Sequence, residues 1–320
     1  MTDRIPSGTR DVLPDEMREL RALTERVRAV FEGAGYGELY TPALEYENQL
    51  ERGALATTRP AYRVFDEHGN VLVLRSDMTL PIARLVSTRY PHDDRPLRFS
   101  YFAHMYREVP PQRGQSREFL QAGVELIGVP APEGTAEVLS VLRSALDAAG
   151  LQTYSIGFGD ASLYPALLEA VGVDRRLHER ILLELVRGNF VALEHEINQL
   201  GLTEEQSELL LRVPQMRGGP EVLEGLSGLL GEVLIGMRDV HALLEPEVAE
   251  RVIFDLGLVR SIGYYTGAVF QVYDPAHGVP IGSGGRYDEL LGRFGEARPA
   301  VGFALNVERL HIALTGEERL

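Results

Sequence analysis

Apolar residues follow two different periods along this chain, and each period predicts its own kind of element. Over residues 14–31 they recur at spacings of three and four, as in a helix with one buried face. Pro14 suits a first helical position, and a glycine-rich stretch ends the segment. The same spacing predicts helices over residues 81–90, with Thr79 as a candidate N-cap, and over residues 134–149.

Short runs of β-branched and aromatic residues, bounded by glycine, proline and polar residues, predict strands. The runs are residues 39–44, 62–74, 97–106, 119–127 and 153–158, then 251–285, and a last one from residue 300 that leads into a last helix. Residues 62–74 predict a hairpin that turns at 68–70. A further helix is expected to start within residues 286–294. Because the strands follow one another as hairpins, they favour an antiparallel sheet with helices on one side, an α+β fold.

Residues 161–245 lack the strand pattern, and Leu, Glu and Arg at helical spacing dominate them. The strands resume after this segment, so the sheet must be discontinuous in sequence. We therefore expect one domain made of residues 1–160 and 246–320, with an inserted helical subdomain at residues 161–245.

Residues 254–273 predict two strands around a tight loop. Arg260 ends the first strand, and Tyr264 and Tyr265 precede the second. An arginine among apolar strand residues is expected to be partly buried, and a buried guanidinium needs an anionic partner. That partner is either a carboxylate of the sheet, in a structural ion pair, or a bound ligand.

Composition excludes several classes of function. The chain of 320 residues is 44% hydrophobic and has no cysteine, and its eight histidines are scattered singly, so neither disulfides nor a metal site are expected. His104, between aromatic residues, is interpreted as a packed core histidine. Without a signal peptide or a long apolar run, a cytoplasmic protein that does not enter membranes is expected. A net charge of −15 without any Lys/Arg-rich run disfavours nucleic-acid binding.

Several stretches resemble the motifs of class II aminoacyl-tRNA synthetases, specifically those of the histidyl enzyme, and they follow the family's order. They are residues 6–14, 106–107 with 119–125, 258–266, and 284–288 with 302–309. The resemblance covers nearly the whole chain and implies a mostly antiparallel sheet flanked by helices. The family synthetase continues into an anticodon-binding domain. This chain ends at Leu320, so no such domain is expected here.

The sequence departs from the synthetase motifs at positions that the family uses for ATP. The acidic residue that holds adenine is replaced by Val109, and a loop arginine that grips the phosphates is replaced by Gln115. The glycine of the final motif becomes Asn306, and the aspartate before the paired tyrosines becomes Gly263. Adenylation depends on such contacts, and each loss of about 1.4 kcal/mol slows a reaction about tenfold.

The amino-acid half of the site is better kept. The resemblance implies a site for a histidine-like ligand formed by Asp77, Thr79, Arg107, Gln121, Glu125, Arg260, Tyr264 and Tyr265, with Arg107 and Arg309 as residual cations of the phosphate site. Several assignments have a structural alternative. Gln121 and Glu125 could form a hydrogen-bond network, Asp77 could cap the next helix, Tyr264 could belong to the core, and Arg309 could neutralise the sheet edge.

This combination resembles the family of regulatory subunits of ATP phosphoribosyltransferase, which are paralogues of the histidyl-tRNA synthetase core. The resemblance implies a protein without catalytic residues, cofactor or metal, which serves the first step of histidine biosynthesis and its feedback inhibition by histidine. It also implies a short-form catalytic ATP phosphoribosyltransferase subunit as partner. A homodimer through the first helix and the 39–44 strand would lie within a hetero-octamer. Two alternatives stay open: a free-standing enzyme that forms histidyl-adenylate, and an inert scaffold.

Overall fold

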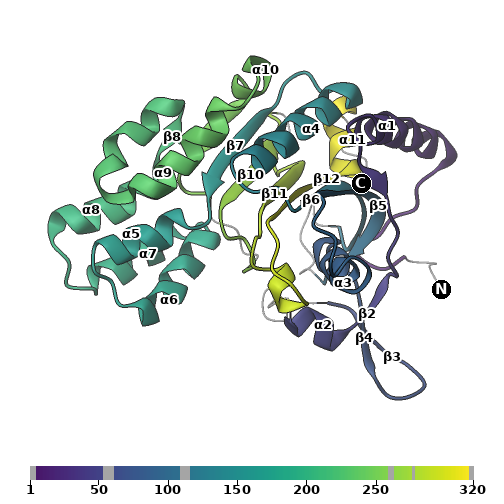
Figure 1. Ribbon diagram of the computed structural model, residues 1–320, viewed down its shortest axis with the longest axis horizontal. Coiled ribbons are helices and arrows are strands. Elements are labelled where there is room, and N and C mark those ends of the chain that lie inside the picture. The colour runs from purple at the N-terminus through teal and green to yellow at the C-terminus, as the bar shows by residue number, and fades with distance from the viewer. Residues whose placement is uncertain (1–4, 53–60, 109–115, 259–262, 276–277, 317–320) are drawn as a thin grey trace.

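A nine-stranded sheet forms the centre of the protein (Figure 1). The structure, a computed structural model, describes residues 5–52, 61–108, 116–258, 263–275 and 278–316. In spatial order the strands are β1 (Gly37–Glu38), β5 (Leu97–Tyr106), β6 (Glu118–Ile127), β12 (Ala300–Asn306), β11 (Gly282–Arg286), β10 (Ala268–Tyr273), β7 (Ser155–Asp160), β9 (Val252–Asp255) and β8 (Arg217–Gly218). Among the strands of the described residues only the pairs β1–β5 and β7–β9 are parallel, so the predicted mostly antiparallel α+β fold is confirmed.

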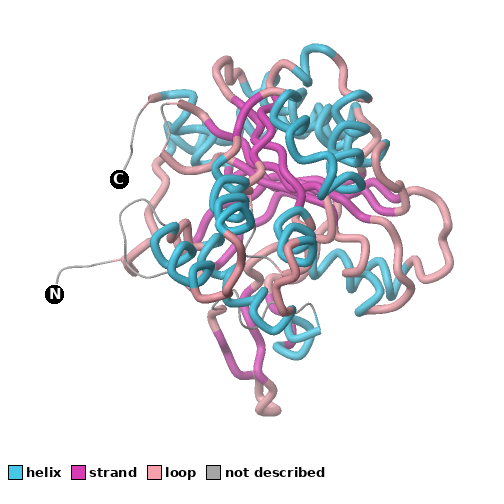
Figure 2. The backbone as a smooth tube through the Cα atoms, turned by 90° about the vertical axis from the view of Figure 1, so that its left-hand side faces the viewer, coloured by secondary structure: helices cyan, strands magenta, loops and turns pink. Residues whose placement is uncertain are grey.

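Helices lie on both faces of this sheet (Figure 2). On one face, α1 (Pro14–Gly33), α4 (Glu133–Ala149) and α11 (Val307–Thr315) pack together against β6 and β12. On the other face, α3 (Thr79–Arg89) packs against β5 and β6. The prediction of helices on one side only was therefore wrong. Both faces of β6 carry buried apolar side chains, Ala122, Val124 and Leu126 on one face and Phe119 and Ile127 on the other, so each face requires cover.

The first helix follows its sequence pattern closely. Leu20, Leu23, Val27 and Phe31 form its buried stripe, and each is at most 5% exposed. Proline stands at its first position, and acidic residues occupy its first turn, where the helix dipole favours them. In contrast, no strand covers the predicted range 39–44. There Pro42 has no N–H to donate to a ladder, and the neighbouring carbonyls of Thr41 and Ala43 accept from Arg75 instead.

A second, three-stranded sheet projects from the rest of the molecule with the order β2–β4–β3. Its elements are β2 (Leu44–Tyr46), β3 (Arg63–Phe65) and β4 (Val71–Leu74), and α2 (Glu47–Arg52) follows β2. The predicted hairpin of β3 and β4 is confirmed. Asp66 fixes its turn by accepting from the backbone N–H groups of His68 and Asn70.

Helices dominate the segment between β7 and β9 and gather at one end of the large sheet (Figure 1). They are α5 (Leu163–Ala170), α6 (Arg175–Val186), α7 (Phe190–Asn198), α8 (Glu204–Arg212), α9 (Ser227–Ala242) and α10 (Pro246–Ala249), with 3-10 turns at Val213–Gln215 and Pro220–Leu226. The short strand β8 also lies in this segment and pairs with β9, which the sequence pattern did not predict. The subdomain boundaries stay a prediction.

Two predictions near the C-terminus were wrong. The strands β9 and β10 do not form a tight hairpin, because β7 lies between them in the sheet. The predicted helix within residues 286–294 is absent. Arg286 still belongs to β11, and the residues after it form one 3-10 turn (Leu291–Arg293) and no α-helix. In the part of the chain that the structure describes, no helix is both long and apolar enough to cross a membrane.

Candidate functional site

The candidate site lies on the sheet face that also carries α3. Along β6 the residues alternate. Val124 and its apolar neighbours two positions away face α1 and α4, whereas Gln121 and Glu125 face the opposite way. Both polar side chains are buried, with 7% and 2% exposure. A period of two therefore places two polar groups on one face of an otherwise apolar strand.

Two glycines in adjacent strands make room for these side chains. Glu125 pairs with Gly302 of β12, which in turn pairs with Gly285 of β11. A Cβ at Gly302 would collide with the Glu125 carboxylate, and a Cβ at Gly285 would come within 2.7 Å of the Tyr265 ring. The carboxylate and the aromatic ring can thus lie flat on the sheet only because both positions are glycine.

Glu125 is the centre of the site. Thr79 donates its hydroxyl to Oε1 of Glu125 at 2.7 Å, and the Tyr287 hydroxyl donates to Oε2. The pKa of Glu125 is raised to about 7, because burial and, to a smaller extent, the charge of the nearby Asp77 raise it more than the two hydroxyl donors lower it. Because this pKa lies near neutral pH, an approaching cation or N–H donor can shift the carboxyl group to its ionised form.

Aromatic side chains enclose this carboxyl group. The Tyr264 ring stands edge-on to those of Tyr265 and Tyr287, with centroids 5.0 and 5.7 Å apart. Tyr264 and Tyr287 are each 3% exposed. Burial, followed by the charge of Glu125, raises the pKa of Tyr287 and of Tyr101 well above the ordinary value, so both keep their hydroxyl protons.

Tyr287 and Tyr101 were not among the predicted site residues. Tyr287 lies in the 284–288 motif, and its position in that motif could have indicated it as a site residue. Tyr101 could have been found from the alternation of the strand at residues 97–106, which puts it on the same face as Glu125. The structure adds both to the predicted residues Thr79, Glu125 and the tyrosine pair.

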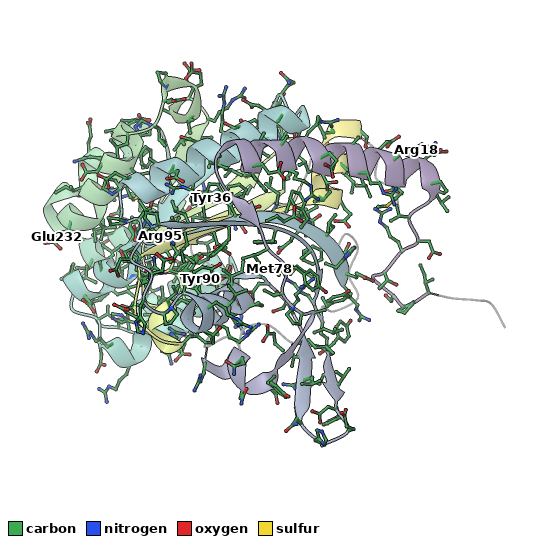
Figure 3. The ribbon with its side chains drawn as sticks, turned by 45° about the vertical axis from the view of Figure 1, so that its right-hand side comes forward. Arg18, Tyr36, Met78, Tyr90, Arg95 and Glu232 are labelled. Carbon is green, nitrogen blue, oxygen red and sulfur yellow. The ribbon has the colours of Figure 1, made fainter. Side chains whose placement is uncertain are left out.

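Asp77 caps α3, as its structural alternative predicted, whereas the prediction of Thr79 as N-cap was wrong. Asp77 accepts from the backbone N–H of Leu80 at 3.1 Å, which satisfies a free donor of the first turn of α3. Thr79 is already helical, and Met78 holds the cap position without a side-chain bond. Met78 itself lies in the interior of the molecule (Figure 3). The Thr79 hydroxyl is thereby left for Glu125.

The side-chain amide of Gln121 provides a hydrogen-bond acceptor for a ligand. Its Oε1 atom is buried and accepts no hydrogen bond from any residue that the structure describes. It lies on the same face as Glu125, opposite Asn306 of β12. A buried acceptor without a donor costs free energy, on the order of 1–3 kcal/mol, which a ligand with an N–H group can recover.

The cations predicted for the phosphate site have partners within the protein. Arg107 donates through Nε to the carbonyl of Ser76 at 3.1 Å, and its guanidinium lies 4.8 Å from the centroid of the Phe119 ring. Arg309 donates to the carbonyl of Pro280 at 2.8 Å, and burial lowers its pKa. Asn306 is the N-cap of α11 and accepts from the backbone N–H of Arg309.

Three positions of the sequence argument, Arg260, Val109 and Gln115, lie outside the described residues. His104, predicted to be packed in the core, is exposed on β5. Its side chain points away from the site face, which its neighbours Ala103 and Met105 share with Glu125. No group of three His, Cys, Asp or Glu residues that could hold a metal ion occurs among the residues described.

Comparisons with known proteins agree with this fold. The sequence profile of the family "Histidyl-tRNA synthetase" matches residues 8–310, and the chain belongs to this family. Among its relatives, an ATP phosphoribosyltransferase regulatory subunit of Symbiobacterium thermophilum is 41% identical over 317 residues, which is 97% of this chain and 79% of that relative.

Solved structures give the same picture. An ATP phosphoribosyltransferase regulatory subunit/histidyl-tRNA synthetase from Bacillus halodurans superimposes with a TM-score of 0.90 at 34% identity, over 98% of this chain and 83% of that one. A histidine–tRNA ligase subunit from Alicyclobacillus acidocaldarius superimposes with a TM-score of 0.82 at 33% identity, over 100% of this chain and 99% of that one. Similar chains thus carry names of two kinds, regulatory and synthetase.

Proposed function

We propose that this chain is a non-catalytic regulatory subunit of ATP phosphoribosyltransferase, required for the first step of histidine biosynthesis and for its feedback inhibition by histidine. One observation carries the proposal: a relative of that name is 41% identical over 97% of this chain. The geometry of the site supports it, because the groups suited to an amino acid lie together, while Arg309, suited to the phosphates of ATP, donates to a backbone carbonyl.

The ligand proposed for the site is histidine. An imidazole N–H fits the buried Glu125 carboxylate, which the Thr79 and Tyr287 hydroxyls already orient. The free acceptor of Gln121 suits an ammonium or a ring N–H. The tyrosine rings supply apolar walls with polar tips. Arg107 or Arg260 would hold the ligand carboxylate.

We expect that the chain does not catalyse the adenylation of histidine. Adenylation requires cations aimed at the phosphates of ATP where charge develops. Arg309 is half-buried and bonded to the Pro280 carbonyl, and Asn306 adds a side chain at the start of α11. Using Arg309 for a phosphate would require breaking a hydrogen bond that is formed in the protein alone.

We expect no histidine-dependent exchange of pyrophosphate into ATP. The measurement is radiolabelled ATP–pyrophosphate exchange on the isolated chain and on the chain mixed with the short catalytic subunit, with a histidyl-tRNA synthetase as positive control. Robust exchange that depends on histidine would contradict the proposal and favour the free-standing enzyme that forms histidyl-adenylate. The histidine–tRNA ligase subunit from Alicyclobacillus makes this test necessary.

The proposed partners are a short-form catalytic ATP phosphoribosyltransferase subunit and a second copy of this chain, within a hetero-octamer in the cytoplasm. An apolar face of the three-stranded sheet suits the second copy. Leu44, Tyr46 and Val64 are 42%, 51% and 39% exposed. Leu44 pairs with Leu74, and Tyr46 and Val64 both pair with Leu72, so all five side chains share one face.

A face without charge can meet an identical face across a two-fold axis even though the whole chain is acidic. Leu44→Glu should therefore weaken self-association, by about tenfold or more for a residue inside such a patch. Sedimentation equilibrium of Leu44→Glu measures this. The matched control is Val191→Glu, which charges another apolar side chain, 81% exposed on α7. Equal dissociation constants for both variants would move the interface elsewhere.

A further inference from the structure

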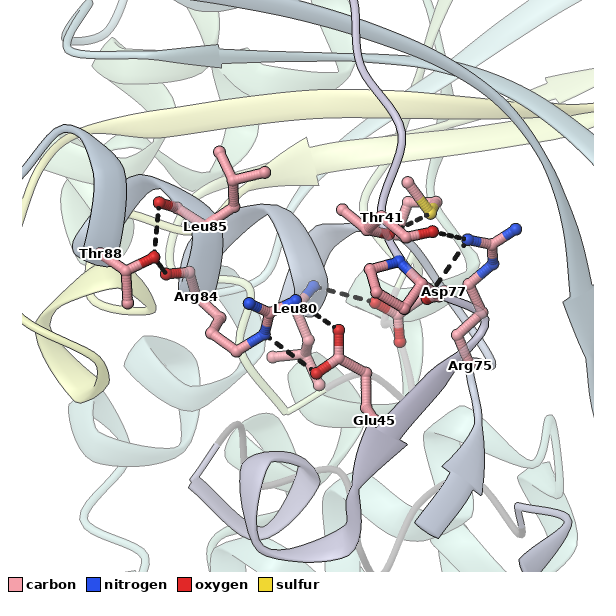
Figure 4. Close-up of polar contacts among 10 residues, drawn as sticks. Thr41, Glu45, Arg75, Asp77, Leu80, Arg84, Leu85 and Thr88 are labelled. Atoms are coloured by element: carbon pink, nitrogen blue, oxygen red, sulfur yellow. Dashed lines mark hydrogen bonds and ion pairs between the residues drawn. The ribbon is translucent and has the colours of Figure 1, made fainter.

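Arg75 is a buried cation with an unusual set of partners. It is 5% exposed, and burial lowers its pKa. Within the described part of the chain no carboxylate lies at ion-pair distance from it. The nearby Glu45 is bound instead by both arms of Arg84, at 2.9 and 2.7 Å (Figure 4). A buried guanidinium without a counter-charge lowers stability, so its position calls for a reason other than ion pairing.

The partners of Arg75 are backbone carbonyls from two separate segments. Nε donates to the carbonyl of His104 in β5 at 3.0 Å. Nη1 donates to the carbonyls of Thr41 at 2.7 Å and of Pro42 at 3.4 Å (Figure 4). The main chain repeats the connection: the Arg75 N–H donates to Ala43 at 2.9 Å, and the Arg75 carbonyl accepts from Tyr106 at 3.0 Å. One residue therefore joins the segment at 41–43 to the end of β5.

The residues that follow Arg75 belong to the candidate site. The Ser76 carbonyl accepts from Arg107, Asp77 caps α3, and Thr79 donates to Glu125. The buried Thr41 hydroxyl also donates to Sδ of Met78 at 3.5 Å. Residues 76–79 are thus held by segment 41–43 on one side and by Glu125 and Arg107 on the other.

The outer side of the same segment is open. Tyr40, whose ring centroid lies 5.9 Å from the Arg75 guanidinium, is 78% exposed. Three residues beyond Thr41 the chain enters β2, whose Leu44 and Tyr46 belong to the apolar face proposed above for a second copy. Arg75 therefore lies between a surface suited to self-association and a site suited to an amino acid.

We infer that Arg75 is a positioning residue that couples self-association at this surface to the affinity for the amino acid. Packing of a second copy on Tyr40 and β2 would fix the 41–43 carbonyls, and Arg75 would pass that constraint to Asp77 and Thr79. The inference rests on the proposed function. Three directional bonds from one planar fork explain why arginine stands here, since lysine offers a single point charge.

The test is Arg75→Lys in the full chain. Histidine affinity is measured by calorimetry at protein concentrations far above and far below the dimer dissociation constant. In the wild-type protein the two dissociation constants for histidine should differ by about fivefold or more. In R75K that ratio should fall to about one. A merely structural role would lower the melting temperature and leave the ratio unchanged.

Arg98→Lys is the matched control, because it alters another arginine with directional bonds, to Glu137 of α4 at 2.8 and 2.7 Å, that joins neither segment 41–43 nor β2 to the site. R98K should keep the wild-type ratio. A second measurement needs no variant: histidine should slow amide hydrogen exchange in residues 40–46 by about fivefold as well as in residues 76–79. A wild-type ratio in R75K, or protection confined to the site, overturns the inference. Wild-type protein that binds no histidine would refute the proposed ligand instead.

Discussion

Replacing Glu125 by alanine is expected to weaken histidine binding by about 100-fold or more. The carboxyl group is 2% exposed, and two hydroxyls fix its orientation. Its loss leaves a ligand N–H without an acceptor in a buried place, which costs about 3 kcal/mol, or roughly a factor of 100 in the dissociation constant. Calorimetry with the isolated chain measures this directly.

The control is Asp160→Ala. Asp160 is another carboxylate whose pKa is raised by burial, and it accepts from Ser162 at the start of α5, away from the cluster around Glu125. D160A should bind histidine within about threefold of the wild-type chain, since no ligand contact is lost. Feedback inhibition should also be measured in the reconstituted complex. Inhibition by histidine that is unchanged in E125A would locate the regulatory site on the partner or at the interface.

Elements set by local periodicity could be predicted from the sequence. The stripe from Leu20 to Phe31 defines α1, and the alternation in β5 and β6 defines the central hairpin. Both depend on residues close together in the chain. The order of strands in the sheet could not be predicted in this way, because β9 pairs with β7 across an interval filled with helices. Local pattern carries no information on that partner.

The candidate site shows the same division. Glu125 and Gln121 are detectable as polar residues within an apolar strand, and the motifs added the tyrosine pair. Tyr287 was missed because its importance comes from a bond to Glu125, a residue 162 positions away in the chain. Asn306 was read as bulk near ATP, whereas the structure uses it as a helix cap. A side chain with two roles cannot be assigned from its position in a motif alone.

Ionisation of Glu125 links the site to the stability of the whole fold. Its pKa rises from the ordinary value of 4.5 to about 7 in the folded chain, so the folded state binds more protons between these values. The stabilisation is therefore complete below about pH 4.5 and is lost as the pH rises through 7. The size of the loss is on the order of 3 kcal/mol, since each pKa unit corresponds to about 1.4 kcal/mol.

Glu125→Gln should remove this part of the pH dependence, because an amide of the same shape does not titrate. Urea unfolding at pH 5, 6, 7 and 8 gives the free energy of unfolding of both proteins. Between pH 5 and 8 the wild-type chain should lose about 2.5 kcal/mol more than E125Q, because part of the total loss has already occurred at pH 5. All other titrating groups are common to the two proteins and cancel in the difference. Parallel curves would mean that Glu125 ionises as an ordinary carboxylate, and the site would then offer a permanent anion to its ligand in place of a group that ionises on binding.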